Sequence, residues 1–422
     1  MDKIICSLEE WDSILDYYRP NGASKTWYIK ELKKMSRPLM WGDWNVLSEQ
    51  GEMFDKGIFV NIITPHYSND IQYVEYQNIK DNKHLYIINI YNDGYFQDNY
   101  DIGFSTISEK YITDIREGRA KIVLFFVFEG YSGSFGNTDF EVIEKWRLDA
   151  GLPVNSVVYV NGNLMSNQIV NSKGYGFQAR GIHNFEPWNK YYETQVVDFK
   201  PVDEKYLFLS YNRQPRVHRI RFAIDLLKQR LFDKGLFSLN SFSYEFDSDT
   251  PQEHVDFLKN NTPFIIDARY DLNYNLAVNI TKEDYEKTFV SVVTETLTIP
   301  NTLFFSEKIW KPIMVGHPFL LLGNQHSLRY LKDLGYKTFD KWFNEDYDSS
   351  YDSDTRARMI TNELKRLSEK SIDELQTMRL EMKEVCEFNQ KRYKELYQQN
   401  YDNGDVSTTI SNILKETWET LN

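Results

Sequence analysis

Charged side chains gather at two places where the sequence predicts that a strand ends and a helix begins. The first follows the strand expected at 205–212 and holds Asn212, Arg213 and Arg216. Free N–H groups and the helix dipole attract phosphate to a helix N-terminus, and arginine adds a fixed charge that can bind two oxygens at once. These residues therefore predict a site for a diphosphate, with Arg213 at the strand end as its main contact.

Three more basic side chains follow in the same stretch. His218 is close enough along the chain to touch a bound phosphate. For Arg219 and Arg221, a solvated basic helix face explains the sequence as well as ligand binding does. His317, which precedes Pro318, is expected to have a structural role.

The second place follows the strand expected at 289–296 and consists of Glu295, then Ser306, Glu307 and Lys308. A carboxylate there can accept two hydrogen bonds from ribose hydroxyls, and a lysine there can meet a phosphate. Spacing alone favours a simpler explanation for Glu307, because glutamate stabilises the first turn of any helix. Ser306 is a plausible N-cap of that helix.

Metal and dinucleotide motifs are not evident in the sequence. The tripeptide Asp-Ser-Asp occurs at 247–249 and at 352–354, but both copies lie in polar loops without a preceding apolar strand. The seven histidines do not cluster, and no glycine-rich loop follows a strand with dinucleotide or P-loop spacing. We therefore expect no metal and no tightly bound cofactor.

Strands and helices alternate along the chain, which predicts parallel sheets of the doubly wound kind. In the first half we expect a short basic helix at 30–37, a helix at 138–150, and strands at 58–63, 84–94, 121–130 and 156–163. Residues 171–203 show neither the helical nor the strand periodicity of apolar residues, and we interpret them as a loop or linker. In the second half we expect strands at 205–212, 263–269, 289–296 and 317–324, helices at 217–235 and 306–316, a short helix with a glycine-linked strand over 326–339, and mainly helix from about 354 onward.

The composition is that of a folded globular protein. Of 422 residues, 41% are hydrophobic and 15% aromatic, which favours well-filled cores over long disorder, and the length suits two domains. The net charge of −13 argues against binding nucleic acid by bulk charge, although it leaves room for a local basic groove.

Two cysteines near opposite ends, Cys6 and Cys386, form no disulfide framework. No apolar run is long enough for a signal peptide or a membrane span, so we expect a soluble cytoplasmic protein with no membrane partner, in the host cytoplasm if the source is viral. The oligomeric state is left open.

The segment FVSVVTET, followed by FFSEKIWKPIMVGHPFLLLG, resembles the donor-binding segment of GT-B glycosyltransferases, especially the α-1,3-fucosyltransferase family. Similar segments occur in bacteriophage proteins. The likeness covers about 35 residues, and the matching positions are Phe305, Ser306, Glu307, Lys308, Ile309, Trp310, Gly316, Pro318 and Gly323. Thr296 stands where that family has an asparagine after the glutamate, which puts the role of Glu295 in question.

This resemblance implies an α/β protein of two Rossmann-like domains facing each other across a cleft. We place an acceptor-side domain at 1–195, a domain that binds the nucleotide sugar at 196–385, and C-terminal helices at 386–422 that return to the first domain. By the family pattern, Glu307 holds the donor ribose, while Lys308 and Arg213 hold the diphosphate. The donor is expected to be a UDP-sugar, with a GDP-sugar as the alternative.

A transferase of the inverting kind needs a base to take the proton of the acceptor hydroxyl. Glu129 is the first candidate, because it directly follows the strongest strand of the N-terminal half. Asp93 is the second, although its Asn-Asp-Gly context is explained more simply as a turn.

The predicted function is transfer of a sugar to an acceptor hydroxyl. The abundance of Tyr, Phe, Asn, Asp and Lys is typical of AT-rich genomes such as those of bacteriophages, so we expect the acceptor to be a hydroxylated cytosine base in phage DNA, as for glucosyl- and arabinosyltransferases of that kind. A surface or lipid-linked glycan, or a protein, is the alternative acceptor. A non-catalytic protein that binds nucleotide sugars or serves a structural role is the alternative of another class.

Overall fold

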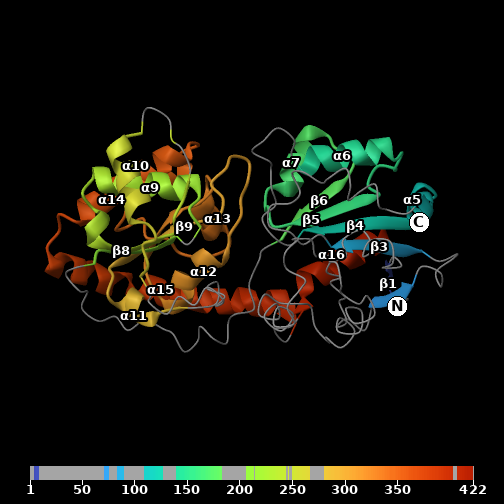
Figure 1. Ribbon diagram of the computed structural model, residues 1–422. Coiled ribbons are helices and arrows are strands. Elements are labelled where there is room, and N and C mark those ends of the chain that lie inside the picture. Colours follow the sequence, from blue (N-terminus) through green and yellow to red (C-terminus); the bar gives the residue numbers. More distant parts are fainter. Residues whose placement is uncertain are drawn as a thin grey trace, which may run out of the picture. The chain divides into compact units, whose positions relative to one another are not determined.

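The computed structural model describes residues 4–8, 71–75, 83–89, 109–126, 139–182, 206–212, 214–243, 246, 250–266, 280–402 and 406–421. The chain divides into two compact units. Unit 1 comprises Met1–Asn184 together with Gln398–Asn422, and unit 2 comprises Phe185–Tyr397. Each unit is built around its own parallel sheet (Figure 1).

The sheet of unit 1 has six strands in the order β2-β1-β3-β4-β5-β6, and every neighbouring pair is parallel. The strands are β1 Ile4–Leu8, β2 Ile71–Glu75, β3 His84–Asn89, β4 Ala120–Phe126, β5 Val157–Asn161 and β6 Gln178–Gly181. The direction in which strands are added reverses between β1 and β3, as in a doubly wound sheet.

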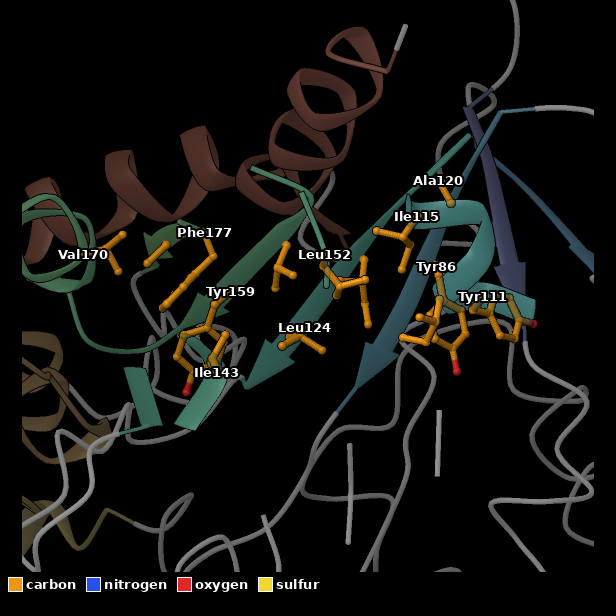
Figure 2. Packing of buried hydrophobic residues seen from close by; sticks show 14 of the residues in the cluster. Tyr86, Tyr111, Ile115, Ala120, Leu124, Ile143, Leu152, Tyr159, Val170 and Phe177 are labelled. Carbon is orange, nitrogen blue, oxygen red and sulfur yellow. The ribbon is translucent and has the colours of Figure 1, made fainter. Parts of the chain in front are cut away.

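Both faces of this sheet are buried over the described side chains of β3, β4 and β5. Ile122 and Leu124 of β4 join one core, which contains side chains of the helices α5 Glu109–Arg116, α6 Asp139–Asp149 and α7 Ser166–Lys173 (Figure 2). Val123 points the other way and packs with Ile413 of α16 Thr408–Glu419. Because both faces are covered, β4 reads as a continuous apolar run in the sequence. The last helix of the chain thus completes the core of unit 1.

The sheet of unit 2 has four parallel strands in the order β10-β9-β7-β8. They are β7 Phe208–Asn212, β8 Gly235–Leu239, β9 Val290–Thr294 and β10 Phe319–Leu322. Helix α9 Val217–Lys228 follows β7 and leads to β8, whereas α12 Glu307–Val315 follows β9 and leads to β10. The chain therefore leaves the two central strands in opposite directions, and the winding of the sheet reverses between β7 and β9.

Helices cover the sheet of unit 2 as well. Helix α14 Ser353–Leu367 and helix α10 Gln252–Asn261 contact α9 (Figure 1). The ring of Trp310 in α12 lies 5.6 Å from that of Tyr393 in α15 Ile372–Asn400. The remaining elements are α11 Lys282–Glu286, α13 Ser327–Asp333, the short 3₁₀ turns η3 Phe232–Lys234 and η4 Asp346–Ser349, and the strand pair β11 Tyr401–Asp402 and β12 Val406–Ser407.

The predicted α/β class with parallel sheets is confirmed, but several local predictions are wrong. Within the expected loop 171–203, α7 ends at Lys173 and the short strand β6 forms at Gln178–Gly181. The expected strand at 263–269 is reduced, among its described residues, to one antiparallel bridge between Phe264 and Leu239. No strand follows α13 over 336–339, and β8 was missed because its five residues directly follow a helical pattern. These elements are short edge segments, for which periodicity carries little signal.

In the part of the chain that the structure describes, no helix combines the length and the apolar character needed to cross a membrane.

The buried ring of His317 ties the start of β10 to its neighbours. Its Nε2 lies 3.0 Å from the carbonyl oxygen of Thr288, and its Nδ1 lies 2.9 Å from the hydroxyl of Ser291. Since a carbonyl only accepts, Nε2 carries the proton and Nδ1 accepts from the serine. Burial, with the charge of Arg379 adding to it, lowers the pKa of His317 to about 3. The structural role expected for this histidine agrees with these contacts.

Acid should therefore destabilise the fold through His317. The unfolded chain binds a proton at this residue near pH 6.5, whereas the folded chain does so only near pH 3. Between these values the unfolded state holds more protons, so the unfolding free energy should fall by about 1.4 kcal/mol for each unit of acidification. His317→Asn should be less stable at pH 7 but show a slope flatter by one proton in urea titrations at several pH values. An unchanged slope would contradict this assignment.

Candidate functional site

The candidate site lies at the carboxyl end of the sheet in unit 2, where β7 and β9 are neighbours. Open parallel sheets bind ligands at such a reversal point, because the loops that follow the two strands separate there. Two helices begin at this edge: α9 follows β7, and α12 follows β9. Most of the described residues that the sequence singled out belong to these two segments.

Glu295, the first residue after β9, is fully buried. Its Oε2 accepts hydrogen bonds from the backbone N–H groups of Ser306 and Thr296, at 3.2 and 3.3 Å, and from the Ser306 hydroxyl. Its Oε1 has no hydrogen-bond partner in the described part of the chain. Burial raises the pKa of this carboxyl, against the opposing charge of Lys308. A buried oxygen without a partner is costly, so it marks a place where a ligand group would be accommodated.

Ser306 sets the first turn of α12. Its extended backbone and its hydroxyl, which accepts a hydrogen bond from the Lys308 N–H at 3.3 Å, make it the N-cap that the sequence predicted. The helix ends at Gly316, whose φ of 77° lies in the left-handed region. This cap fixes where Glu307 and Lys308 emerge beside the end of β9.

The ammonium group of Lys308 lies among three acceptors. It donates to Thr296 Oγ1 at 3.1 Å, to Ser306 Oγ at 3.3 Å and to Glu307 Oε1 at 2.5 Å. Although burial raises the pKa of Glu307, the charges of Lys308 and Lys311 outweigh it and hold that pKa below its usual range. Glu307 is therefore an anion paired with the lysine next to it.

The start of α9 meets the same glutamate from its backbone side. His218 Nε2 lies 2.9 Å from the carbonyl oxygen of Glu295, and Arg219 Nη2 donates to the carbonyl oxygens of Thr294 and Glu295 at 3.1 and 3.2 Å. Arg216 occupies the N-cap position of α9. Glu295 thus joins the N-termini of both helices, through its main chain to α9 and through its side chain to α12.

His218 is neutral at this position. Burial, together with the charges of Arg219 and Arg216, lowers the pKa of His218 to about 3, although the hydrogen bond to Glu295 opposes the change. Its Nε2 must carry the proton, because the carbonyl of Glu295 can only accept. His218 therefore positions the end of β9 and contributes no charge of its own.

Asn212 lies at the end of β7, but its amide faces the sheet interior. Its Nδ2 donates to Ser210 Oγ at 2.9 Å, and its Oδ1 accepts from the Thr294 hydroxyl. The residue is fully buried. Asn212 thus holds β7 against β9, and these contacts differ from the donor-binding role predicted for it.

The other residues predicted for the site fall into three groups: those that contact one another, those outside the described residues, and one at the surface. Glu295, Ser306, Glu307 and Lys308 come together in one hydrogen-bonded group, as the contacts above describe. Arg213, Glu129 and Asp93 lie outside the described residues. Arg221 forms an ion pair with Asp354, which agrees with a surface role for that arginine.

Arg219 and Arg356 stabilise the backbone around the site, but the sequence predicted this role for neither of them. Arg356 is buried in α14 and donates four hydrogen bonds to carbonyl groups, those of Gly323, Ser350, Tyr351 and Thr298. It thereby joins the loops that follow β9 and β10. The role of Arg356 could not be predicted from the local sequence, because its hydrogen-bond partners lie up to 58 positions away along the chain.

The second Asp-Ser-Asp tripeptide begins α14, so the prediction that it lies in a loop is wrong: Asp352 is the N-cap, and Ser353 and Asp354 are the first helical residues. Asp352 Oδ2 accepts from the backbone N–H of Thr355 at 2.7 Å and caps α14. Within the described ranges, no three His, Cys, Asp or Glu side chains are grouped so that they could hold a metal ion.

No family model matches this chain, and no curated protein matches it. The chemistry open to the site follows from its geometry. The site combines two helix N-termini with basic residues, the Lys308–Glu307 pair and the Glu295 carboxyl, one of whose buried oxygens has no partner among the described residues. Such a set suits a ligand that carries both anionic oxygens and hydroxyl groups.

Proposed function

We propose that the chain is a glycosyltransferase whose unit 2 binds a nucleotide-diphosphate sugar, and that the two units form a GT-B enzyme. The observation that carries the proposal is the meeting of two helix N-termini at Glu295, at the reversal point of a parallel sheet: α9 begins with arginines, and α12 begins with the Glu307–Lys308 pair. This edge is where nucleotide-binding sheets hold their ligands. The resemblance of the segment 289–323 to a donor-binding segment supports the same site.

The basic side chains are assigned to the leaving group. As the bond between sugar and diphosphate breaks, negative charge grows on the diphosphate oxygens, and fixed cations stabilise that charge best where water is excluded. Lys308 and Arg216 are the described residues proposed for this role, together with Arg213. The carboxylate of Glu307 is proposed to accept hydrogen bonds from ligand hydroxyls.

For the catalytic base and the acceptor molecule, the proposal keeps the predictions made from the sequence. We propose Glu129, or else Asp93, as the base, and a hydroxylated cytosine in DNA as the acceptor, with a glycan or a protein hydroxyl as the alternative. Mass spectrometry of the nucleosides, after incubation of such DNA with nucleotide sugars, separates these acceptors. A nucleoside profile that stays unchanged with every donor would exclude DNA.

Replacing Lys308 by alanine should weaken binding of a nucleoside diphosphate about 30- to 100-fold, because a charge-assisted contact to phosphate is lost. Isothermal titration with UDP and GDP measures this, and thermal melting checks that the variant folds. Lys365→Ala is the matched control, because Lys365 forms a similar lysine–glutamate pair, at 3.5 Å, on the surface of α14. If neither nucleotide binds the natural chain, or if Lys308→Ala binds as tightly as the control, the proposal fails.

A further inference from the structure

The carboxyl edge of the sheet in unit 1 also carries a polar side chain without a complete set of contacts. Asn161 is the last residue of β5, and in strand register it lies between Phe126 of β4 and Gly181 of β6. The residue is fully buried, and its Nδ2 has no hydrogen-bond partner in the described part of the chain. A buried N–H group without an acceptor costs free energy, so it marks a place where a ligand atom would be accommodated.

The orientation of this carboxamide follows from its neighbours. Asn161 Oδ1 accepts a hydrogen bond from the backbone N–H of Asn163 at 2.8 Å, and the Ser166 hydroxyl donates to it at 2.5 Å. Because a backbone N–H can only donate, the atom that faces it must be the carboxamide oxygen, and the atom without a partner among the described residues is the nitrogen. A carboxamide nitrogen offers protons and accepts none. The ligand atom must therefore be a hydrogen-bond acceptor.

The same contacts place the carboxamide at the N-terminus of α7, because Asn163 and Ser166 lie at the start of that helix. Met165, the N-cap residue, makes no capping hydrogen bond with its side chain, and the first turn contains no acidic residue. The first N–H groups of a helix and its dipole attract anions, and here no carboxylate of the first turn competes for them. Val170 of α7 packs in the same core as Tyr159 of β5, which holds the helix against the strand (Figure 2).

We propose that Asn161 Nδ2 and the first turn of α7 form an anion-binding site in unit 1, and that its ligand is a phosphate group. Both parts supply N–H donors, which suits a negatively charged oxygen. A phosphate carries several such oxygens, so one can meet Asn161 while another meets the helix N-terminus. The site lies in a different unit from Glu295 and does not depend on the function proposed for that site. A free phosphate ion and the phosphodiester of a nucleic acid share this chemistry.

Asn161→Asp removes the donor with the smallest change of shape. Aspartate keeps an oxygen for the backbone N–H of Asn163, and it places a second oxygen where the nitrogen was. Isothermal titration of the full chain with inorganic phosphate should therefore show binding at least about tenfold weaker than in the natural chain. A dinucleoside monophosphate is titrated in the same way. An equal loss for both ligands would assign the site to phosphodiesters as well, whereas a loss for phosphate alone would assign it to the free ion.

Asn171→Asp is the matched control, because Asn171 is an exposed residue of the same helix whose Nδ2 donates to Asn167 at 3.3 Å. It adds the same charge near the other end of α7 and should change phosphate affinity by less than about twofold, since exposed charges are screened. The comparison is repeated in the Lys308→Ala background, which removes a proposed phosphate contact in unit 2, and the loss caused by Asn161→Asp should remain there. The proposal is wrong if that loss disappears, if the natural chain binds no phosphate, or if Asn161→Asp and Asn171→Asp weaken binding equally.

A second measurement on the natural chain covers the case in which Asn161→Asp does not fold. In ¹⁵N NMR spectra, addition of inorganic phosphate should shift the side-chain amide resonances of Asn161 and leave those of Asn171 in place. Asn161 resonances that stay unchanged, at phosphate concentrations that saturate the titration, would overturn the proposal.

Discussion

Replacing Arg356 by alanine should lower the unfolding free energy by about 3–5 kcal/mol, since bonds from a charged donor to four carbonyls, two of them buried and two partly buried, are lost together. The guanidinium joins Thr298, beyond β9, to Gly323, beyond β10, and also holds Ser350 and Tyr351. Alanine would leave these carbonyl oxygens without donors and a cavity where the side chain had been. Urea denaturation, with the midpoint and the slope measured separately, gives the change.

Arg358 provides the control for this prediction. It lies two residues further along α14, its side chain is 58% exposed, and it contacts Thr355 and Asp352 at the surface. Arg358→Ala should change the unfolding free energy by less than about 0.5 kcal/mol. Similar losses of unfolding free energy in the two variants would mean that the four hydrogen bonds of Arg356 do not determine stability. Because Arg356 anchors the loop that leads to Ser306, its alanine variant should also bind nucleotide more weakly.

Replacing Trp310 by alanine should cost about 3–5 kcal/mol, the range for deleting a large aromatic side chain from a packed core. Trp310 points from α12 into the core of unit 2, where its ring lies 5.7 Å from that of Phe305, 5.9 Å from Tyr336 and 5.6 Å from Tyr393. These contacts fix α12 between the loop before it and the long helix α15. The loss therefore acts on the helix that carries Glu307 and Lys308.

Trp342→Ala separates core packing from the loss of a tryptophan in general. Trp342 is only half-buried, and its Nε1 donates to Glu381 at 2.7 Å near the surface. Its replacement should cost about 1 kcal/mol, roughly the value of one exposed hydrogen bond and a partial contact. Equal destabilisation of the two variants in thermal melts would contradict the central position of Trp310.

Elements buried on both faces could be predicted from the sequence, because their signal is local. The apolar run of β4 gives the start of that strand to within one residue, and the amphipathic pattern of α9 gives its first residue, although the helix ends at Lys228, seven residues before the predicted end at 235. Ser306 was predicted as an N-cap for the same reason, since a cap depends on the residue and the turn that follows it. Short edge strands such as β6 and β8 were missed, because four or five residues carry too little pattern.

Side-chain direction could not be predicted in this way. Asn212 ends one apolar strand and Glu295 follows another, yet the amide of Asn212 bonds to Ser210 and Thr294. One buried oxygen of Glu295, by contrast, has no hydrogen-bond partner among the described residues. Arg219 was equally compatible with a solvated face, but its guanidinium donates to carbonyls about 75 residues away. Which alternative holds depends on neighbours that only the folded sheet supplies.

The amino-acid sequence alone determined the α/β class, the strands β3, β4, β5, β7, β9 and β10, and the two segments that carry the candidate site, because hydrophobic periodicity and helix caps act over a few residues. The tertiary structure decided that both segments meet at Glu295, that Arg356 ties the loops behind them, and that α16 completes the core of unit 1. These features join residues far apart in the chain, and their energy comes from burial and hydrogen bonds that exist only after the sheets have formed.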